Sequence, residues 1–196
     1  MNYDIENEIA SLGYGIICGT DEAGRGPLAG DVYAAAVILP AGLEIEGLND
    51  SKKLTEKKRE KLFGIITEKA ISYGIAKATN EEIDELNILN AALLAMRRAI
   101  EQLDPQPDFI LIDGNMTRGF TLPCRAVVKG DSLSPSIAAA SILAKVSRDR
   151  SCLEMDRLYP EYGFAKHKGY PTKEHYDAIE KFGPLPIHRK SFRLYR

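Results

Sequence analysis

Four acidic side chains, each within three residues of a glycine, are the groups of this chain best suited to chemistry. Asp21 and Asp113 end short apolar runs, Glu22 follows Asp21 directly, and Asp131 follows a third apolar run. Carboxylates held close together repel one another and do not all stay ionised unless a cation joins them. Oxygen ligands without a His or Cys partner favour Mg²⁺ or Mn²⁺ over zinc. If the fold brings these acids together, they predict a divalent metal site.

Each acid taken alone has a simpler interpretation, because an Asp at a strand end commonly satisfies backbone donors in a turn. Strand geometry adds a constraint on two of them. Adjacent residues of a regular strand point to opposite faces, so Asp21 and Glu22 reach one ion only where the strand ends or bulges. The following Gly24 and Gly26 favour such a break.

The elements that must position the acids alternate between strands and helices. We expect strands at residues 15–21, 31–39, 71–79, 109–113 and 125–128. Helices are expected after Thr55, from Asn80 as N-cap to about Leu103, from Ser134 as cap with Pro135 in the first turn to about Tyr159, and after Thr172. Apolar runs followed by amphipathic helices predict an α/β fold with a mixed sheet and helices on its faces. Ligands in such folds gather outside the strand ends, where the acids lie.

Composition excludes several classes of protein. The chain has 196 residues, 44% hydrophobic and 28% charged, which is typical of one soluble globular domain. No apolar stretch is long enough to span a bilayer, and the acidic N-terminus is unlike a signal peptide. Its three cysteines are too few for a disulfide framework or a zinc quartet. We therefore expect a cytoplasmic protein with reduced thiols.

The charge is unevenly distributed along the chain. Residues 1–117 carry 11 Lys and Arg against 20 Asp and Glu, whereas residues 118–196 carry 15 against 8. A basic region can bind phosphate, although a solvated charged tail has the same composition. Residues 166–173 interleave basic side chains with Tyr170, a pattern that suits a phosphate backbone and base stacking, or an ordinary exposed loop. Lys52 is a second candidate phosphate contact, or part of a solvated helix flank.

Other catalytic sites fit the sequence poorly. Residues 19–26 have the glycine spacing of a phosphate-binding loop, but Arg25 and Gly26 replace the Lys and Ser or Thr that such a loop needs. The serines near position 134 lack the Gly-x-Ser-x-Gly context of a hydrolase nucleophile. The three histidines have no metal-ligand spacing, so we interpret them as surface or core residues. The Gly24-Arg25-Gly26 segment suits close approach of backbone to a sugar–phosphate chain.

Six segments together resemble bacterial ribonuclease HII, the type 2 ribonuclease H. They are GTDEAGRGPLAG at 19–30, NDSKKLT at 49–55, LIDGN at 111–115, KGDSLSPSIAAASILAKVSRD at 129–149, GFAKHKGYPT at 163–172 and PIHRKSFR at 186–193. The resemblance covers nearly the whole chain in the family's order. It implies a ribonuclease-H-like mixed sheet flanked by helices, with residues 1–159 as the catalytic core. Residues 160–196 would form a small helical and irregular basic segment that packs on the core and contributes to substrate binding.

The resemblance also implies an activity and a set of site residues. The family cleaves the RNA strand of RNA–DNA hybrids and incises duplex DNA 5′ to a single ribonucleotide, leaving 5′-phosphate and 3′-hydroxyl ends. The implied metal-binding and catalytic residues are Asp21, Glu22, Asp113 and Asp131. The implied nucleic-acid-binding residues are Gly24, Arg25 and Gly26, which read the 2′-hydroxyl, Lys52, which contacts phosphate, and Tyr170, which packs at the RNA–DNA junction.

Two Mg²⁺ or Mn²⁺ ions are the implied cofactors, the second binding with the substrate. We expect a monomer; a sliding-clamp partner is compatible with the resemblance, but the C-terminus carries no convincing clamp-binding motif. Two other hypotheses stay open. A nuclease of the same fold could act on plain DNA, although DNA offers no 2′-hydroxyl to the glycine–arginine–glycine loop. A non-catalytic hybrid-binding module would bind normally without metal-dependent turnover.

Overall fold

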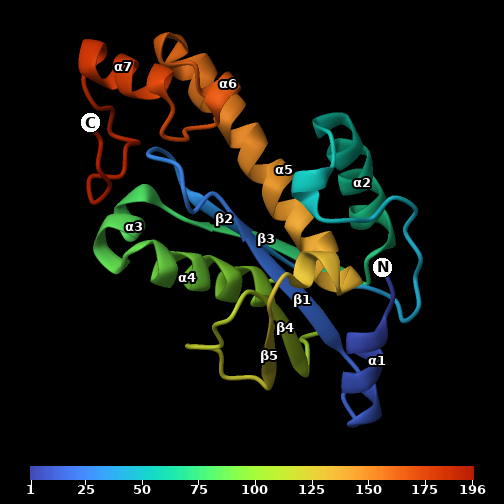
Figure 1. Ribbon diagram of the computed structural model, residues 1–196. Helices are drawn as coiled ribbons and strands as arrows, with labels where there is room; N and C mark the ends of the chain where they lie inside the picture. The colour runs from blue at the N-terminus through green and yellow to red at the C-terminus, as the bar shows by residue number, and fades with distance from the viewer.

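A five-stranded mixed sheet forms the centre of the computed structural model, which describes residues 1–196 (Figure 1). The strand order is β3-β2-β1-β4-β5. The first three strands pair antiparallel, whereas β4 runs parallel to both β1 and β5. The strands are β1 (Ile17–Ala23), β2 (Val32–Ile38), β3 (Ser72–Ala78), β4 (Phe109–Asp113) and β5 (Cys124–Val127). The predicted mixed sheet is confirmed.

Helices cover both faces of this sheet (Figure 1). α4 packs on one face, and α5 with α2 packs on the other. The helices are α1 (Asp4–Ser11), α2 (Glu56–Lys69), α3 (Asn80–Leu86), α4 (Ile88–Ile100), α5 (Pro135–Leu158), α6 (Phe164–His167) and α7 (Lys173–Phe182), with short 3₁₀ turns η1 (Ser51–Lys53), η2 (Gly130–Ser132) and η3 (Pro160–Tyr162). None of the helices is both long and apolar enough to cross a membrane.

β2 is apolar along its whole length and does not alternate between apolar and polar residues. Ala34 and Ala36 pack toward α4, while Ala35 and Val37 pack toward α5 and α2. Successive strand residues point to opposite faces, and here both faces are covered. The small side chains of β2 therefore belong to two separate cores.

α5 begins close against β1 because Gly19 has no side chain. A Cβ on Gly19 would overlap the backbone of Ser136 and Ile137 at the start of α5. Ser134 caps the helix by accepting a hydrogen bond from the backbone N–H of Ile137 (3.3 Å), and Pro135 occupies the first turn, as predicted. The contact seats α5 over the strand that carries Asp21.

The helix predicted from Asn80 to Leu103 is two helices. Thr79, not Asn80, is the first N-cap, and it forms a capping box with Glu82. Asn87 has φ of +67° and separates α3 from α4; its side chain accepts hydrogen bonds from the backbone N–H groups of Leu89 and Asn90. The apolar spacing continues across the break, so periodicity alone predicted one helix.

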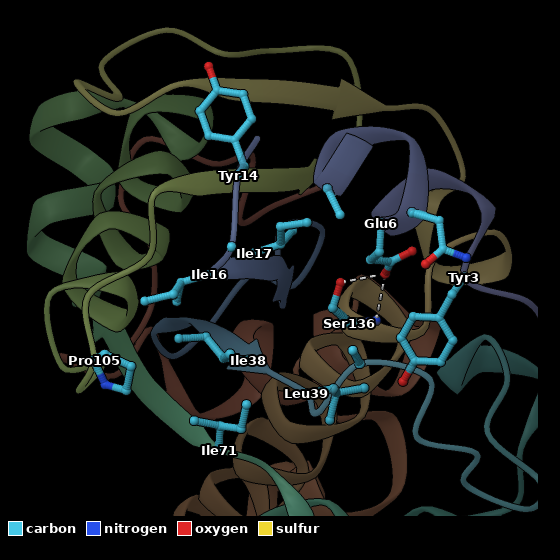
Figure 2. A pocket seen from close by; sticks show the side chains of 14 residues that line it. Tyr3, Glu6, Tyr14, Ile16, Ile17, Ile38, Leu39, Ile71, Pro105 and Ser136 are labelled. Carbon is cyan, nitrogen blue, oxygen red and sulfur yellow. Dashed lines mark hydrogen bonds between the residues drawn. The ribbon is translucent and has the colours of Figure 1, made fainter. Parts of the chain in front are cut away.

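α1 was not predicted. Its Glu6 side chain accepts hydrogen bonds from the hydroxyls of Ser134 (2.6 Å) and Ser136 (2.7 Å), which connect α1 to the start of α5. Figure 2 shows the contact between Glu6 and Ser136. A mainly apolar pocket of about 340 Å³ lies beside it, lined by Ile17 at the start of β1 and Ile38 at the end of β2. The pocket is therefore at the opposite end of β1 from Asp21 and Glu22.

The last part of the chain packs against the loop that follows β1. Phe164 and Ile179 form an apolar cluster with Leu28 and Ala29. The helix expected after Thr172 is α7, and the short α6 was not predicted. The division into residues 1–159 and 160–196 remains a prediction.

Candidate active site

The parallel pairing of β1 with β4 places Asp21 beside Asp113. Thr20 is opposite Ile112 in the ladder, so the next residue of each strand is one of these acids, at the same edge of the sheet. Strand alternation turns both side chains toward α5. Asp21 pairs with Ala35, which packs on the α5 side, and Asp113 lies two residues after Leu111, which packs against Ile137 of α5. The expected meeting of strand ends is thus present for these two acids.

Glu22 lies on the other face. β1 continues without a bulge to Ala23, which pairs with Tyr33, so Asp21 and Glu22 point in opposite directions across the strand. The break expected at the glycines is therefore absent at Glu22. Glu22 and Asp113 line both the cleft on the α5 side and a hollow toward α4. The two carboxylates adjacent in sequence thus approach the end of the sheet from its two sides.

Asp131 joins the group from η2. Its backbone N–H donates a hydrogen bond to Oδ1 of Asp113 (3.2 Å), and its Oδ2 accepts one from Nζ of Lys52 (3.3 Å). Burial alone lowers the pKa of Lys52, but Asp131 and Asp21 raise it overall. Asp131 itself is buried. It connects Asp113 to a lysine that faces solvent.

Three of these carboxyls hold their protons more tightly than usual. Burial raises the pKa of Asp21 well above its ordinary value, and Glu22 and Asp113 raise it further. Burial also raises the pKa of Glu22, against the opposing effect of Arg25. The pKa of Asp113 is raised by burial although the backbone N–H of Asp131 favours its charged form. Raised pKa values in adjacent carboxyls mark a place where a cation would be stabilised.

The donor chemistry fits a hard divalent cation, but the acids do not form a closed cage. No three His, Cys, Asp or Glu side chains in the molecule are gathered closely enough to hold a metal ion. Mg²⁺ keeps waters and takes oxygens from substrate phosphates, so it needs only one or two carboxylates at a time. Carboxylates arranged around an open cleft suit that kind of binding.

The cleft has a volume of about 250 Å³ and is lined by all but one of the predicted site residues. Asp131 is the exception, and it reaches the cleft only through Asp113 and Lys52. The lining residues are Asp21, Glu22, Ala23, Gly24, Arg25, Gly26, Ser51, Lys52, Asp113, Ser141, Lys145, Arg148 and Tyr170. Tyr170 is 43% exposed at the rim, and its ring packs beside Gly26. One cleft therefore combines acidic, basic, glycine-rich and aromatic walls.

Three lining residues on α5 were not predicted. Ser141, Lys145 and Arg148 lie four and three residues apart, on one face of the helix. Hydrogen bonding of Ser141 to Asp21 partly offsets the rise in the pKa of Asp21. Arg148 is buried and donates a hydrogen bond to the Lys168 carbonyl (2.9 Å). Polar residues at helical spacing within an alanine-rich helix are the sequence signal that could have identified them.

The chain is similar to known proteins in sequence and in fold. The family model described as Ribonuclease HII matches residues 18–195. The chain is 58% identical over 187 residues to "Ribonuclease HII" of Clostridioides difficile (strain 630), covering 95% of this chain and 73% of the relative. It is 61% identical over 179 residues to "Ribonuclease HII" of Marinomonas sp. (strain MWYL1), covering 90% and 89%.

Solved structures are similar to this chain in fold. The ribonuclease H2 from Pyrococcus horikoshii OT3 superimposes with a TM-score of 0.76 at 28% identity, covering 92% of this chain and 95% of that one. The crystal structure of Bst-RNase HIII in complex with Mn²⁺ gives a TM-score of 0.68 at 16% identity, covering 91% and 67%. At that identity the second likeness concerns the fold alone.

Proposed function

The chain belongs to the ribonuclease HII family and is a ribonuclease H, an endonuclease that acts on RNA in RNA–DNA hybrids; from this premise we propose that it also incises duplex DNA 5′ to a single embedded ribonucleotide. The products would carry 5′-phosphate and 3′-hydroxyl ends, and incision would begin ribonucleotide removal. The observation that supports this is the composition of the cleft. Buried carboxylates share it with a glycine–arginine–glycine loop and a partly exposed tyrosine.

The proposed cofactors are two Mg²⁺ or Mn²⁺ ions. Asp21, Glu22, Asp113 and Asp131 would hold them, together with oxygens of the scissile phosphate. The chemistry that two bound divalent ions supply is charge stabilisation of the attacking and leaving oxygens in an in-line displacement. The raised pKa values of Asp21, Glu22 and Asp113 support a role for these carboxyls as cation ligands.

The other walls of the cleft are proposed to select the substrate. The backbone of Gly24, Arg25 and Gly26 would contact the ribose 2′-hydroxyl, the one group that distinguishes RNA from DNA at a given position. Lys52, whose side chain is 74% exposed, would neutralise a phosphate. Tyr170 would pack at the step from ribose to deoxyribose. We propose that the chain does this as a monomer.

The test is cleavage of a labelled DNA duplex that contains one ribonucleotide, beside the same duplex in DNA alone. Each is incubated with Mg²⁺ and with a chelator. We expect incision of the first duplex only, 5′ to the ribonucleotide and only with metal. Equal cleavage of both would make the protein a DNA nuclease. Binding without cleavage, on this duplex and on a long hybrid with Mn²⁺, would make it a binding module.

A further inference from the structure

Two consecutive residues near the C-terminus are buried behind the cleft. His188 is 1% exposed and Arg189 is 0% exposed, although both belong to the basic end of the chain. Their backbone runs along the loop that follows β1: the Gly30 N–H donates to the Ile187 carbonyl, and the Arg189 N–H donates to the Leu28 carbonyl, each at 2.8 Å. Arg189 is therefore not free to bind substrate phosphate, and its buried surroundings indicate a different role.

The Arg189 guanidinium makes all its hydrogen bonds to backbone carbonyls of this loop. Nε donates to Gly30 (2.9 Å), and Nη2 donates to Gly24 (2.7 Å). Nη1 donates to both Arg25 (3.0 Å) and Pro27 (2.7 Å). Burial lowers the pKa of Arg189 to about 9, which leaves it charged at neutral pH. A planar fork can hold four carbonyls at once, whereas a lysine ammonium acts from a single point.

His188 begins a chain of hydrogen bonds that ends at Tyr170. Its Nδ1 accepts from the Leu185 N–H (2.8 Å), so its proton is on Nε2, which faces Nε2 of His175 at 3.1 Å. His175 accepts there and carries its own proton on Nδ1, which donates to the Tyr170 carbonyl (3.0 Å). Burial lowers the pKa of both rings, that of His175 to about 4, so both are neutral at physiological pH.

The third histidine, His167, is hydrogen-bonded to the turn that leads into Tyr170. Nδ1 of His167 accepts from the Gly169 N–H (3.1 Å), and its Nε2 donates to the Tyr162 carbonyl (2.7 Å). Its ring stacks on His175 with centroids 4.5 Å apart. The hydrogen bonds thus assign one tautomer to each ring and leave no ring nitrogen free for a metal.

The loop that follows β1 and the turn that leads into Tyr170 also contact each other directly. The Leu28 N–H donates to the Gly169 carbonyl (2.8 Å). Gly24 has φ of +104°, and a Cβ there would overlap the Arg148 side chain, whose guanidinium lies 6.0 Å from the centre of the Tyr170 ring. The loop and the turn that leads into Tyr170 therefore contact each other beside the cleft. The segment with His188 and Arg189 does not line the cleft, but Arg189 is hydrogen-bonded to the loop and His188 is linked to Tyr170 through His175.

We propose that His188 and Arg189 form one positioning unit that sets the distance between the two substrate-reading walls of the cleft. Arg189 holds the carbonyls of Gly24, Arg25, Pro27 and Gly30, and His188 holds Tyr170 through His175. The proposal rests on the proposed function, in which the loop reads the ribose and Tyr170 reads the following step. Reading two adjacent sugars requires a fixed separation, since a displacement of about 1 Å can cost about 100-fold in rate.

The first test replaces the planar Arg189 guanidinium by a lysine ammonium, which keeps the positive charge. Arg189→Lys is compared with Arg157→Lys, an exposed site at the end of α5 that pairs with Glu154. On the single-ribonucleotide duplex we expect Arg189→Lys to lower kcat about tenfold or more, with KM and the affinity measured in chelator changed less than about threefold. Arg157→Lys should behave as wild type. A folded Arg189→Lys enzyme with wild-type kcat, or with equal losses of affinity and kcat, would overturn the proposal.

The second test addresses Tyr170. His175→Phe fills the space but removes the donor to the Tyr170 carbonyl, whereas His175→Asn keeps an N–H near the position of Nδ1. The readout is the cut position within a duplex carrying four consecutive ribonucleotides. We expect His175→Phe to spread the cuts over several positions and His175→Asn to retain most of the wild-type pattern. A purely structural role would reduce the amount of product without moving the cut, and that result would overturn the proposal.

Hydrogen exchange separates failure of this proposal from failure of the proposed function. A wild-type enzyme that cuts none of the ribonucleotide substrates refutes the proposed function. Amide exchange across residues 19–30 and 163–172 still reports positioning: Arg189→Lys should accelerate the first segment, and His175→Phe the second. Unchanged exchange in both would overturn the positioning role. Should Arg189→Lys fail to fold, the two His175 variants decide the question.

Discussion

At the scale of single residues, the acidic site is defined by the burial of its carboxyl groups and by the face of the sheet on which each of them lies. Asp21 and Asp113 are neighbours on the α5 side, and Glu22 approaches from the α4 side. Burial raises the pKa of Asp21 most, and repulsion from Glu22 and Asp113 raises it further, so Asp21 is the residue whose change is most informative. Two predictions follow from its environment, one on activity and one on stability.

We predict that Asp21→Asn lowers cleavage of a hybrid by more than about 100-fold, since even residues that only support metal ligands cost about 10- to 100-fold when changed. Binding of the hybrid, measured by fluorescence anisotropy in chelator, should change little because phosphate contacts dominate affinity. Asp177→Asn, at an exposed site on α7, is the matched control. Loss of binding as large as the loss of rate would contradict the assignment of Asp21 as a metal ligand.

We predict that the same substitution stabilises the metal-free protein at neutral pH. The pKa of Asp21 is raised in the folded state, so the folded protein binds a proton more tightly than the unfolded chain and loses stability as pH rises through the raised pKa. Asn removes that loss. The thermal midpoint in chelator should therefore be higher for Asp21→Asn at pH 7, with the difference vanishing at acid pH. An unchanged or lower midpoint at pH 7 would show that the burial of Asp21 and its repulsion from Glu22 and Asp113 do not destabilise the folded protein.

At the scale of elements, the site depends on how closely α5 approaches β1. Gly19 permits the contact, and Ser141, Lys145 and Arg148 bring the polar face of α5 to the cleft. Moving the helix would therefore disturb the surroundings of Asp21 as well as the core.

We predict that Gly19→Ala destabilises the protein by about 1–3 kcal/mol, because its Cβ would overlap backbone that cannot rotate away. Cleavage should also fall. Gly64→Ala is the matched control: Gly64 is in the interior of α2 with nothing within 4 Å of an added Cβ, so alanine should stabilise it by about 0.4–1 kcal/mol. Urea unfolding of both variants checks this. A neutral effect at Gly19 would mean that α5 shifts freely on β1.

At the scale of the whole molecule, the uneven charge and the buried histidines determine how solution conditions act. Substrate binding is expected to depend on cations around the cleft despite the net charge of −2. The C-terminal packing depends on histidines that are neutral when folded. Salt should therefore affect the affinity for substrate, whereas acid should affect the stability of the fold.

We predict that affinity for a hybrid falls as salt rises, and that Lys52→Ala lowers the slope of log K against log salt by about one, the value expected for one lost phosphate contact. Lys69→Ala, at the end of α2 and away from the cleft, should leave the slope unchanged. Anisotropy titrations at several salt concentrations measure both. Equal slopes for wild type and Lys52→Ala would remove Lys52 from the phosphate contacts.

We predict that acid weakens the fold through His175. The pKa of His175 is about 4 in the folded protein against 6.5 ordinarily, so between these values the unfolded chain binds more protons and stability falls as pH drops. The contribution is at most about 3 kcal/mol. The free energy of unfolding of His175→Phe, measured from pH 7 to pH 4, should fall less than that of wild type. Parallel pH profiles would show that His175 does not titrate on unfolding.

Local pattern determined much of the fold. The apolar runs that became β1 to β5, the Ser134-Pro135 start of α5 and the acids at the strand ends were predicted because each depends on neighbours in the chain. The motifs at 19–30, 111–115 and 129–149 also led to the family, which the matched relatives confirm. Periodicity missed the break at Asn87, whose positive φ interrupts the backbone without interrupting the apolar spacing.

Tertiary structure alone decided how distant segments meet. Glu22 approaches from the face opposite Asp21 because β1 continues, paired with β2, beyond the last residue paired with β4. Arg189 looks like part of a basic tail in the sequence, yet it is buried among carbonyls more than 150 positions earlier. Such contacts depend on chain topology and on the shape of the packed surface, which residue types and spacing do not encode locally. The sequence therefore determined the chemical groups and their elements, and only the packing of the chain decided which of those groups support one another.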